Sequence, residues 1–130
     1  MRLYLVRHGE AAPGEPDELR QLTPEGRAQA RALGERLRKE GVQPDAVLTS
    51  PLLRARETGA ELARNLGVEP EPDDRLAPGA TLEDVRAAVA GRGERIVAVG
   101  HQPDCGRVAA ELTGREPAFP AGSMVVLELE

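Results

Sequence analysis

The sequence predicts a three-layer α/β/α sandwich with a mainly parallel central sheet. Short segments rich in strand formers alternate with longer segments that carry helix caps and apolar stripes, which is the pattern of parallel strand–helix units. One short segment, residues 95–100, holds four consecutive apolar residues, as expected of a strand covered on both faces. His8 and His101 each follow such a segment, so the carboxyl edge of the sheet would bring them together.

The first third of the chain is expected to form a strand, a loop and a helix. Residues 2–7 are rich in strand formers and lead into a glycine, which predicts a strand that ends at a tight loop. Residues 11–22 contain two prolines, a glycine and several charges without apolar periodicity, which indicates a surface loop. Thr23 followed by Pro24 is typical of a helix start, and an apolar stripe continues from there until Gly41.

A second strand–helix pair follows. Residues 45–49 carry a short apolar run and predict a strand. Ser50 and Pro51 repeat the cap-plus-proline signature, and they predict a helix that Gly67 ends. Arg54 then falls in the first turn of this helix, where it would lie near the end of the preceding strand.

The middle of the chain predicts a connection, a helix and the most buried strand. Residues 68–80 are rich in proline and acidic residues, which indicates a connection with room for one short strand near either end. Thr81 and Asp84 have the spacing of a capping box, and the helix that they open would end at Gly91. The apolar run of residues 95–100 then forms a strand.

A helix and a strand complete the predicted order. Residues 103–112 predict a helix that ends at Gly114, and residues 123–130 alternate between apolar and polar positions as a last strand. The predicted order is therefore β-α-β-α-(loop)-α-β-α-β. Strands that alternate with helices in this way favour a parallel sheet between two helical layers.

Length and composition limit the possible classes of function. The 130 residues fit one domain, residues 1–130. The net charge of −5, with both signs interspersed, argues against nucleic acid or an anionic membrane as the main partner. The single Cys105 cannot form an internal disulfide, and the apolar run of residues 3–6 is too short for a signal peptide or a membrane span. We expect a cytoplasmic protein.

The two histidines are the first candidates for chemistry. A single histidine after a strand is more often a capped or core residue than a catalytic one. His8 and His101 both follow strands, however, and this shared placement indicates a common site. One option is a metal centre, because two imidazoles with Glu10 or Asp104 could form a two-histidine-one-carboxylate set.

The arginines favour an anion site over a metal centre. Arg7 adjoins the first histidine and Arg54 lies at a helix start, so a cation would meet fixed positive charge there. A phosphate would instead be bound by the guanidinium groups and helix N–H groups. A thiolate phosphatase built on Cys105 is disfavoured, because Arg107 follows after only one residue and could not wrap around a phosphate.

Four separated motifs resemble one family. They are Arg-His-Gly-Glu at residues 7–10, Leu-Thr-Pro-Glu-Gly at residues 22–26, Ser-Pro-Leu-Leu-Arg-Ala at residues 50–55 and Gly-His at residues 100–101. In this order and over most of the chain, they resemble the histidine phosphatase (phosphoglycerate mutase-like) superfamily. Four motifs in order are far more specific than one Arg-His-Gly triplet.

The resemblance implies a two-step reaction and a phosphoglycerate mutase-like fold. His8 would take the phosphoryl group while neutral, and water would then hydrolyse the phosphohistidine. Arg7, Arg54 and His101 would hold the phosphoryl oxygens, with Gly9 contributing to substrate binding. Such catalysis depends on positioning and charge and requires neither metal nor cofactor.

One departure from the family bears on the substrate. Many members carry a proton-donating acid where this chain reads Ala-Pro-Gly-Ala at residues 77–80, although Asp74, Glu83 or Asp84 could be recruited instead. A phosphohistidine tolerates the loss, because its imidazole leaves as a neutral base whose conjugate acid has a pKa of about 6.5. The chain therefore looks like the SixA branch of phosphohistidine protein phosphatases, in which an arginine placed like Arg20 lines the substrate side.

The leading hypothesis is a phosphatase that acts on phosphohistidine in another protein. The short chain has little material for a lid, and an open site would suit a phosphorylated protein. The alternative within the superfamily is a phosphomonoesterase acting on a small metabolite. The alternative outside enzymes is a phosphate-binding module that does not turn over.

Overall fold

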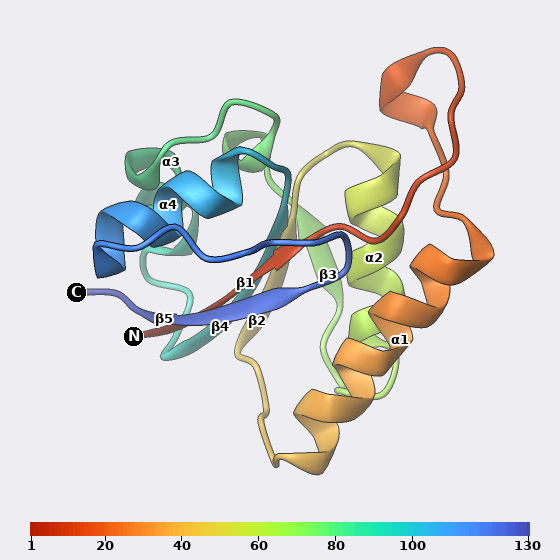
Figure 1. Cartoon of the computed structure of the whole chain (residues 1–130). Helices are drawn as coiled ribbons and strands as arrows, with labels where there is room; N and C mark the ends of the chain where they lie inside the picture. Colours follow the sequence, from red (N-terminus) through yellow and green to blue (C-terminus); the bar gives the residue numbers. More distant parts are fainter.

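A five-stranded sheet in the order β3-β2-β4-β1-β5 runs through the middle of the molecule (Figure 1). The structure is a computed structural model that describes residues 1–130. All neighbouring strands are parallel except β5, which is antiparallel to β1, so the predicted mainly parallel sheet is confirmed. The strands are β1 (Arg2–Arg7), β2 (Ala46–Thr49), β3 (Pro70–Pro72), β4 (Arg95–Gly100) and β5 (Met124–Glu128).

Two pairs of helices cover the two faces of the sheet. The helices α1 and α2 lie on one face, and α3 and α4 lie on the other (Figure 1), which confirms the three-layer sandwich. The helix bounds are α1 (Pro24–Lys39), α2 (Leu53–Ala63), α3 (Leu82–Val89) and α4 (Asp104–Thr113), with short 3-10 helices η1 (Asp17–Leu19) and η2 (Asp74–Leu76). None of these helices combines the length and the apolar character that crossing a membrane requires.

The alternation of side chains along the strands divides the core in two. On β1, Leu3 and Leu5 belong to the larger core of 16 buried residues beneath α3 and α4. Tyr4 and Val6 face the smaller core of 10 buried residues beneath α1 and α2. Because successive side chains of a strand point to opposite faces, the part of a strand that is buried on both sides must be apolar, as residues 96–99 of β4 are.

The predicted capping residues set two helix starts. The Thr23 side chain accepts a hydrogen bond from the Gly26 amide of α1, and Leu33 and Leu37 of this helix are buried in the core. Thr81 and Asp84 form a complete capping box at the start of α3. Both arrangements satisfy amide groups that the first turn of a helix leaves without partners.

The predicted start and end of α2 were wrong. The helix begins at Leu53, and Ser50 does not cap it, because the Ser50 hydroxyl contacts His101 and accepts from the Leu52 amide instead. At the other end α2 stops at Ala63 and a turn continues to Gly67. Arg54 still lies in the first turn, as predicted.

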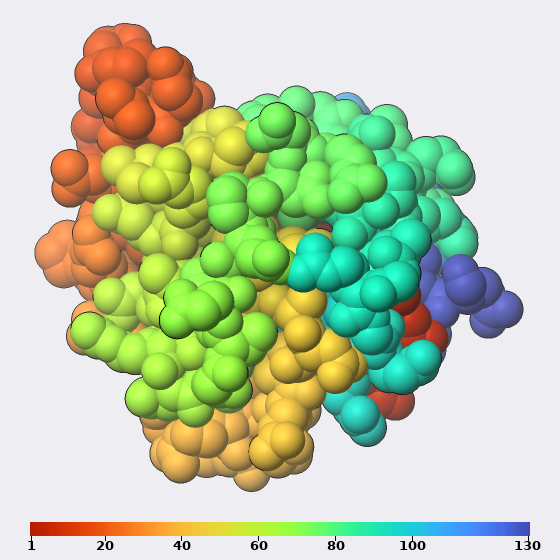
Figure 2. Space-filling model, turned by 180° about the vertical axis from the view of Figure 1, so that it is seen from behind, coloured from red at the N-terminus to blue at the C-terminus, as the bar shows by residue number.

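The segment of residues 11–22 is a loop, as predicted, and it projects from the body of the molecule (Figures 1 and 2). A bridge between Ala11 and Leu22 closes its base, and the Ala12 amide donates to the carbonyl oxygen of Gln21 at 2.8 Å. Its far part contains η1 and returns over the carboxyl end of the sheet. This loop brings charged side chains to the candidate site.

Candidate active site

The two histidines meet at the carboxyl edge of the sheet. β1 and β4 are adjacent and parallel, and the His8 amide donates to the carbonyl oxygen of Gly100 at 3.0 Å. The ring centroids of His8 and His101 are 5.1 Å apart, with an angle of 62° between the ring planes. The prediction that the histidines converge is therefore confirmed.

Local hydrogen bonds fix the ring of His8. Its Nδ1 lies 2.7 Å from the carbonyl oxygen of Gly9. A carbonyl oxygen can only accept, so Nδ1 carries the proton of the neutral ring and the lone pair is on Nε2. The Gly9 amide is itself bonded to the Thr58 hydroxyl at 3.0 Å, and that hydroxyl donates to the carbonyl oxygen of Arg54 at 2.7 Å. Thr58 thus ties the loop after β1 to α2.

Gly9 also permits a close approach between two backbones. A Cβ atom at this position would lie 2.5 Å from the carbonyl oxygen of Gly26, closer than real Cβ contacts allow. A side chain at residue 9 would therefore push the loop away from α1 and displace the carbonyl oxygen that orients His8.

The pKa of His8 is lowered from its usual value. Burial of the ring is the main cause, and the positive charges of Arg54, Arg7 and Arg20 act in the same direction, while the contact with Gly9 opposes them. His8 is therefore neutral at pH 7, with an unprotonated Nε2 beside a group of arginines.

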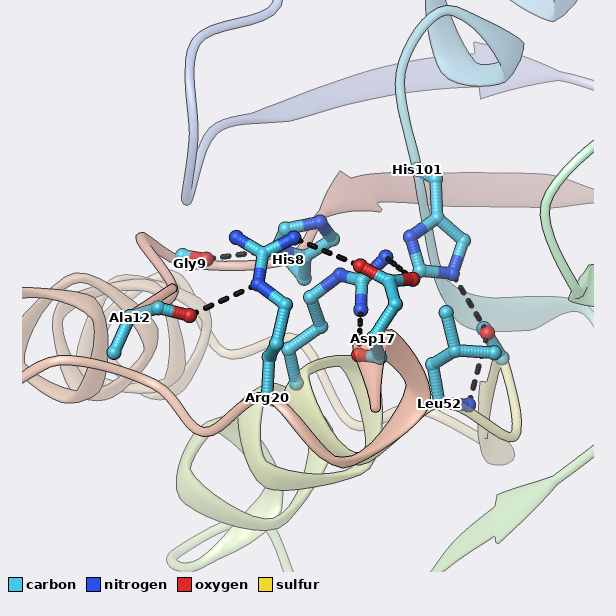
Figure 3. Close-up of polar contacts among 9 residues, drawn as sticks. His8, Gly9, Ala12, Asp17, Arg20, Leu52 and His101 are labelled. Carbon is cyan, nitrogen blue, oxygen red and sulfur yellow. Dashed lines mark hydrogen bonds and ion pairs between the residues drawn. The ribbon is translucent and has the colours of Figure 1, made fainter. Parts of the chain in front are cut away.

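His101 is more deeply placed and is bonded to a serine. Only 4% of its surface is exposed, and its Nε2 lies 2.7 Å from the Ser50 hydroxyl oxygen. That oxygen also accepts from the Leu52 amide at 3.2 Å, which leaves the hydroxyl proton available for His101. The other ring nitrogen, Nδ1, is buried without a partner in the protein, and it faces His8 and Asp17 (Figure 3).

Burial lowers the pKa of His101 to about 4, and the charges of His8 and Arg54 contribute to the shift. An unfolded chain binds this proton near pH 6.5, whereas the folded chain binds it only near pH 4, so stability falls as the pH is lowered between these values. We expect the free energy of unfolding to fall by about 2 kcal/mol from this residue between pH 7 and 5.

Urea denaturation at pH 7 and at pH 5 would test this expectation. The variant His101→Gln lacks the titrating group, so its loss of stability over the interval should be smaller by about that amount. His8 shifts in the same direction and remains in both proteins. An identical pH dependence in the variant and the parent would show that burial of His101 does not depress its pKa.

Three arginines surround the histidines and differ in their partners. Arg54 is almost fully buried, and its two terminal nitrogens donate to Asp17, one to the backbone oxygen at 2.9 Å and one to the carboxylate at 3.3 Å. Arg7 donates to the carbonyl oxygen of Phe119 at 3.0 Å, and its buried Nε lacks a partner. Arg20 donates to the Ala12 carbonyl oxygen at 2.9 Å and to the Asp17 carboxylate at 3.1 Å.

The sequence did not point to Asp17 or Thr58. Asp17 lies in a loop without periodicity. The one sequence pattern that could have indicated its role is its position three residues before Arg20, which places both residues on one short helical turn. Thr58 lies four residues after Arg54, one turn further along the same helix face. The Asp17 carboxylate is held ionised, because hydrogen bonds and charge from Arg20 and Arg54 lower its pKa.

The acids considered as proton donors have other roles in the structure. Asp84 belongs to the capping box with Thr81, and Asp74 and Glu83 are exposed on η2 and α3. Neither Asp74 nor Glu83 makes a hydrogen bond to the histidines. Their observed positions give no support to a recruited acid.

The metal-centre and thiolate alternatives receive no support from the geometry. Glu10 accepts from the Thr23 hydroxyl, and Asp104 accepts from the Gly79 amide. No group of three or more His, Cys, Asp and Glu side chains is placed to hold a metal ion. Burial raises the pKa of the Cys105 thiol to about 12, so the thiolate that such a phosphatase needs is strongly disfavoured.

Comparison with known proteins agrees with these features. Residues 3–78 match the model of the histidine phosphatase superfamily (branch 1). The whole chain is 30% identical to phosphohistidine phosphatase SixA of Escherichia coli strain K12 and covers 86% of that protein. A 64-residue segment, 48% of the chain, is 45% identical to mitochondrial serine/threonine-protein phosphatase Pgam5 of Drosophila mojavensis and covers 22% of it. A solved structure of the protein histidine phosphatase SixA complexed with tungstate matches with a TM-score of 0.90 at 27% identity, over 100% of this chain and 89% of that one.

Proposed function

Because the chain belongs to the histidine phosphatase superfamily, branch 1, we propose that it is a phosphohistidine phosphatase that works through a phosphorylated His8. The observation that carries this proposal is the state of the His8 ring. Its Nδ1 is bonded to the Gly9 carbonyl oxygen at 2.7 Å, so Nε2 has a free lone pair in a pocket rich in guanidinium groups. A neutral imidazole beside fixed positive charge is suited to attack a phosphoryl group.

In the first step, His8 Nε2 forms a bond to phosphorus as the bond from phosphorus to the substrate nitrogen breaks. The substrate ring already carries a proton from solvent on its other nitrogen, so it keeps the electron pair of the broken bond and leaves as neutral imidazole. In the second step, water attacks phosphorus, the bond to His8 breaks and inorganic phosphate is formed. Arg7 and Arg54 bind the phosphoryl oxygens, with Arg20 at the open side, and their charge stabilises both transition states.

His101 acts in this proposal as a neutral hydrogen-bond donor. Its pKa of about 4 excludes a stable imidazolium at pH 7. Because the Ser50 oxygen already accepts from the Leu52 amide, we assign the hydroxyl proton to Nε2, which places the ring proton on Nδ1, the nitrogen that faces the site (Figure 3). A phosphoryl oxygen then supplies the partner that buried Nδ1 lacks within the protein.

The leaving group decides between the substrate classes. An alkoxide from a serine or a sugar requires a proton donor, and the carboxylate nearest to the site, Asp17, is held ionised. An imidazole leaves without one. The similarity over the full chain to a protein named phosphohistidine phosphatase supports phosphohistidine as the substrate class. We place this phosphohistidine in a phosphotransfer protein of the cytoplasm. His8 and Arg20 are only half-buried, and the Asp17 side chain beside them is 60% exposed, so we infer that another protein can reach this side of the site.

The test compares substrates at equal concentration in the presence of a chelator. We expect a phosphohistidine-carrying protein to be hydrolysed at least about a hundredfold faster than a phosphoserine peptide or a sugar phosphate, because only the imidazole leaves without a proton donor. Equal or faster cleavage of the esters, lost in Asp74→Asn or Glu83→Gln, would establish a metabolite phosphomonoesterase instead. Binding without turnover of any of them would establish a phosphate-binding module.

A further inference from the structure

The guanidinium groups of the phosphoryl pocket already share an anion that the protein supplies. The Asp17 carboxylate has one oxygen 3.1 Å from Arg20 and the other 3.3 Å from Arg54 (Figure 3). Two oxygens of one group that contact two guanidinium groups reproduce the contacts expected of a phosphoryl group at this position. Asp17 therefore occupies donors that the substrate needs.

Arg54 requires such a partner in the free protein. Only 8% of its side chain is exposed, and a buried guanidinium without a counter-ion is unfavourable. The Asp17 carboxylate neutralises this charge when no phosphoryl group is bound. An incoming phosphoryl group must then exchange with it, because a dianion and a carboxylate at the same donors repel each other.

The exchange needs only a small movement. The Asp17 side chain is 60% exposed and lies on the loop that projects from the molecule (Figure 2). Its backbone oxygen holds the other terminal nitrogen of Arg54 separately, at 2.9 Å. Rotation of the carboxylate into solvent therefore frees one nitrogen of Arg54 and one of Arg20 while the loop stays attached.

We propose that Asp17 is a built-in competitor of the phosphoryl group, whose carboxylate returns to Arg54 and Arg20 when phosphate is released. This inference rests on the proposed function and adds to it a residue that governs product release. The exchange keeps an anion on the two guanidinium groups through the whole cycle. It also weakens the binding of inorganic phosphate, which would otherwise accumulate on a pocket of three arginines.

Binding of inorganic phosphate, measured by isothermal titration calorimetry, tests the inference without requiring turnover. Asp17→Asn keeps the shape and removes the charge, and Asp17→Ala removes the contact altogether. Both variants should bind phosphate about three- to tenfold more tightly than the parent, in line with the strength of a partly exposed ion pair. Glu18→Gln is the matched control, because Glu18 is the exposed neighbour on the same turn, and it should leave the affinity unchanged.

Kinetics separate competition from a merely structural role. In both Asp17 variants the inhibition constant for phosphate and the KM should fall together, whereas loss of a structural support would raise the KM. Unchanged or weaker phosphate binding in both variants, with normal binding by the parent, would overturn this inference and leave the proposed function intact. Absence of phosphate binding in the parent and in both variants would overturn the two together.

Discussion

Replacement of His8 with asparagine should abolish turnover of every phosphorylated substrate. We expect kcat to fall by about ten-thousand-fold or more, because loss of a nucleophile leaves only the electrostatic part of catalysis. The physical reason is specific to one atom. Nε2 of His8 is the single unprotonated ring nitrogen that is free of protein partners, whereas His101 Nε2 is bonded to Ser50. An asparagine amide can fill the space but cannot accept the phosphoryl group.

The covalent intermediate gives a second readout for the same variant. Mixing the parent protein with a labelled phosphodonor and quenching in alkaline detergent should trap one labelled histidine, because phosphohistidine survives base and hydrolyses in acid. The label should be absent from His8→Asn and present, though formed more slowly, in His101→Gln. Label that persists in His8→Asn and disappears in His101→Gln would assign the nucleophile to His101.

The framework of the site could be predicted because it depends on strand ends. The observed bounds of β1 and β4 are Arg2–Arg7 and Arg95–Gly100, which are the two segments predicted from apolar runs. Once both runs are strands of one parallel sheet, the residues that follow them must meet at its carboxyl edge. The solved structures that superpose on the whole chain, including SixA with tungstate, agree with the phosphoglycerate mutase-like fold that the motifs implied.

Local sequence patterns could not predict the hydrogen bonds of the site that join segments distant in the sequence. Ser50 followed by Pro51 has the signature of a helix cap, and a local rule assigns its hydroxyl to the helix. The hydroxyl instead contacts His101, which lies 51 positions away in the sequence. A rule based on neighbouring residues cannot detect such a competitor, so the start of α2 was placed too early.

The loop of residues 11–22 shows a similar limit. Its lack of periodicity correctly predicted an irregular segment, but no pattern indicated which of its charged side chains would turn inward. Asp17 contacts Arg54 across 37 positions, and this contact forms in a loop whose base is closed by the bridge between Ala11 and Leu22. The sequence showed that residues 77–80 contain no acid to donate a proton. It did not show that an ionised carboxylate, that of Asp17, lies beside the arginines of the site.

Substitution of Arg54 should have the second largest effect and should separate charge from geometry. We expect Arg54→Ala to lower kcat/KM by about a hundred- to a thousandfold, the range measured when one preorganised donor to a transition state is removed. Arg54→Lys should recover only a small part, because an ammonium group keeps the charge but cannot direct two parallel N–H groups at the phosphoryl oxygens.

The matched control for Arg54 is Arg56→Ala, two positions along the same helix, where the side chain is exposed and kcat/KM should not change.

Phosphate affinity distinguishes the role of Arg54 from that of its partner, Asp17. It should fall in Arg54→Ala, which removes a donor, and rise in Asp17→Asn, which removes a competitor for the same donor. A fall in both variants would instead mean that Asp17 and Arg54 act as one structural unit. Near-parental kcat/KM in Arg54→Ala would show that Arg54 serves to anchor the loop and that Arg7, Arg20 and His101 bind the phosphoryl group without it.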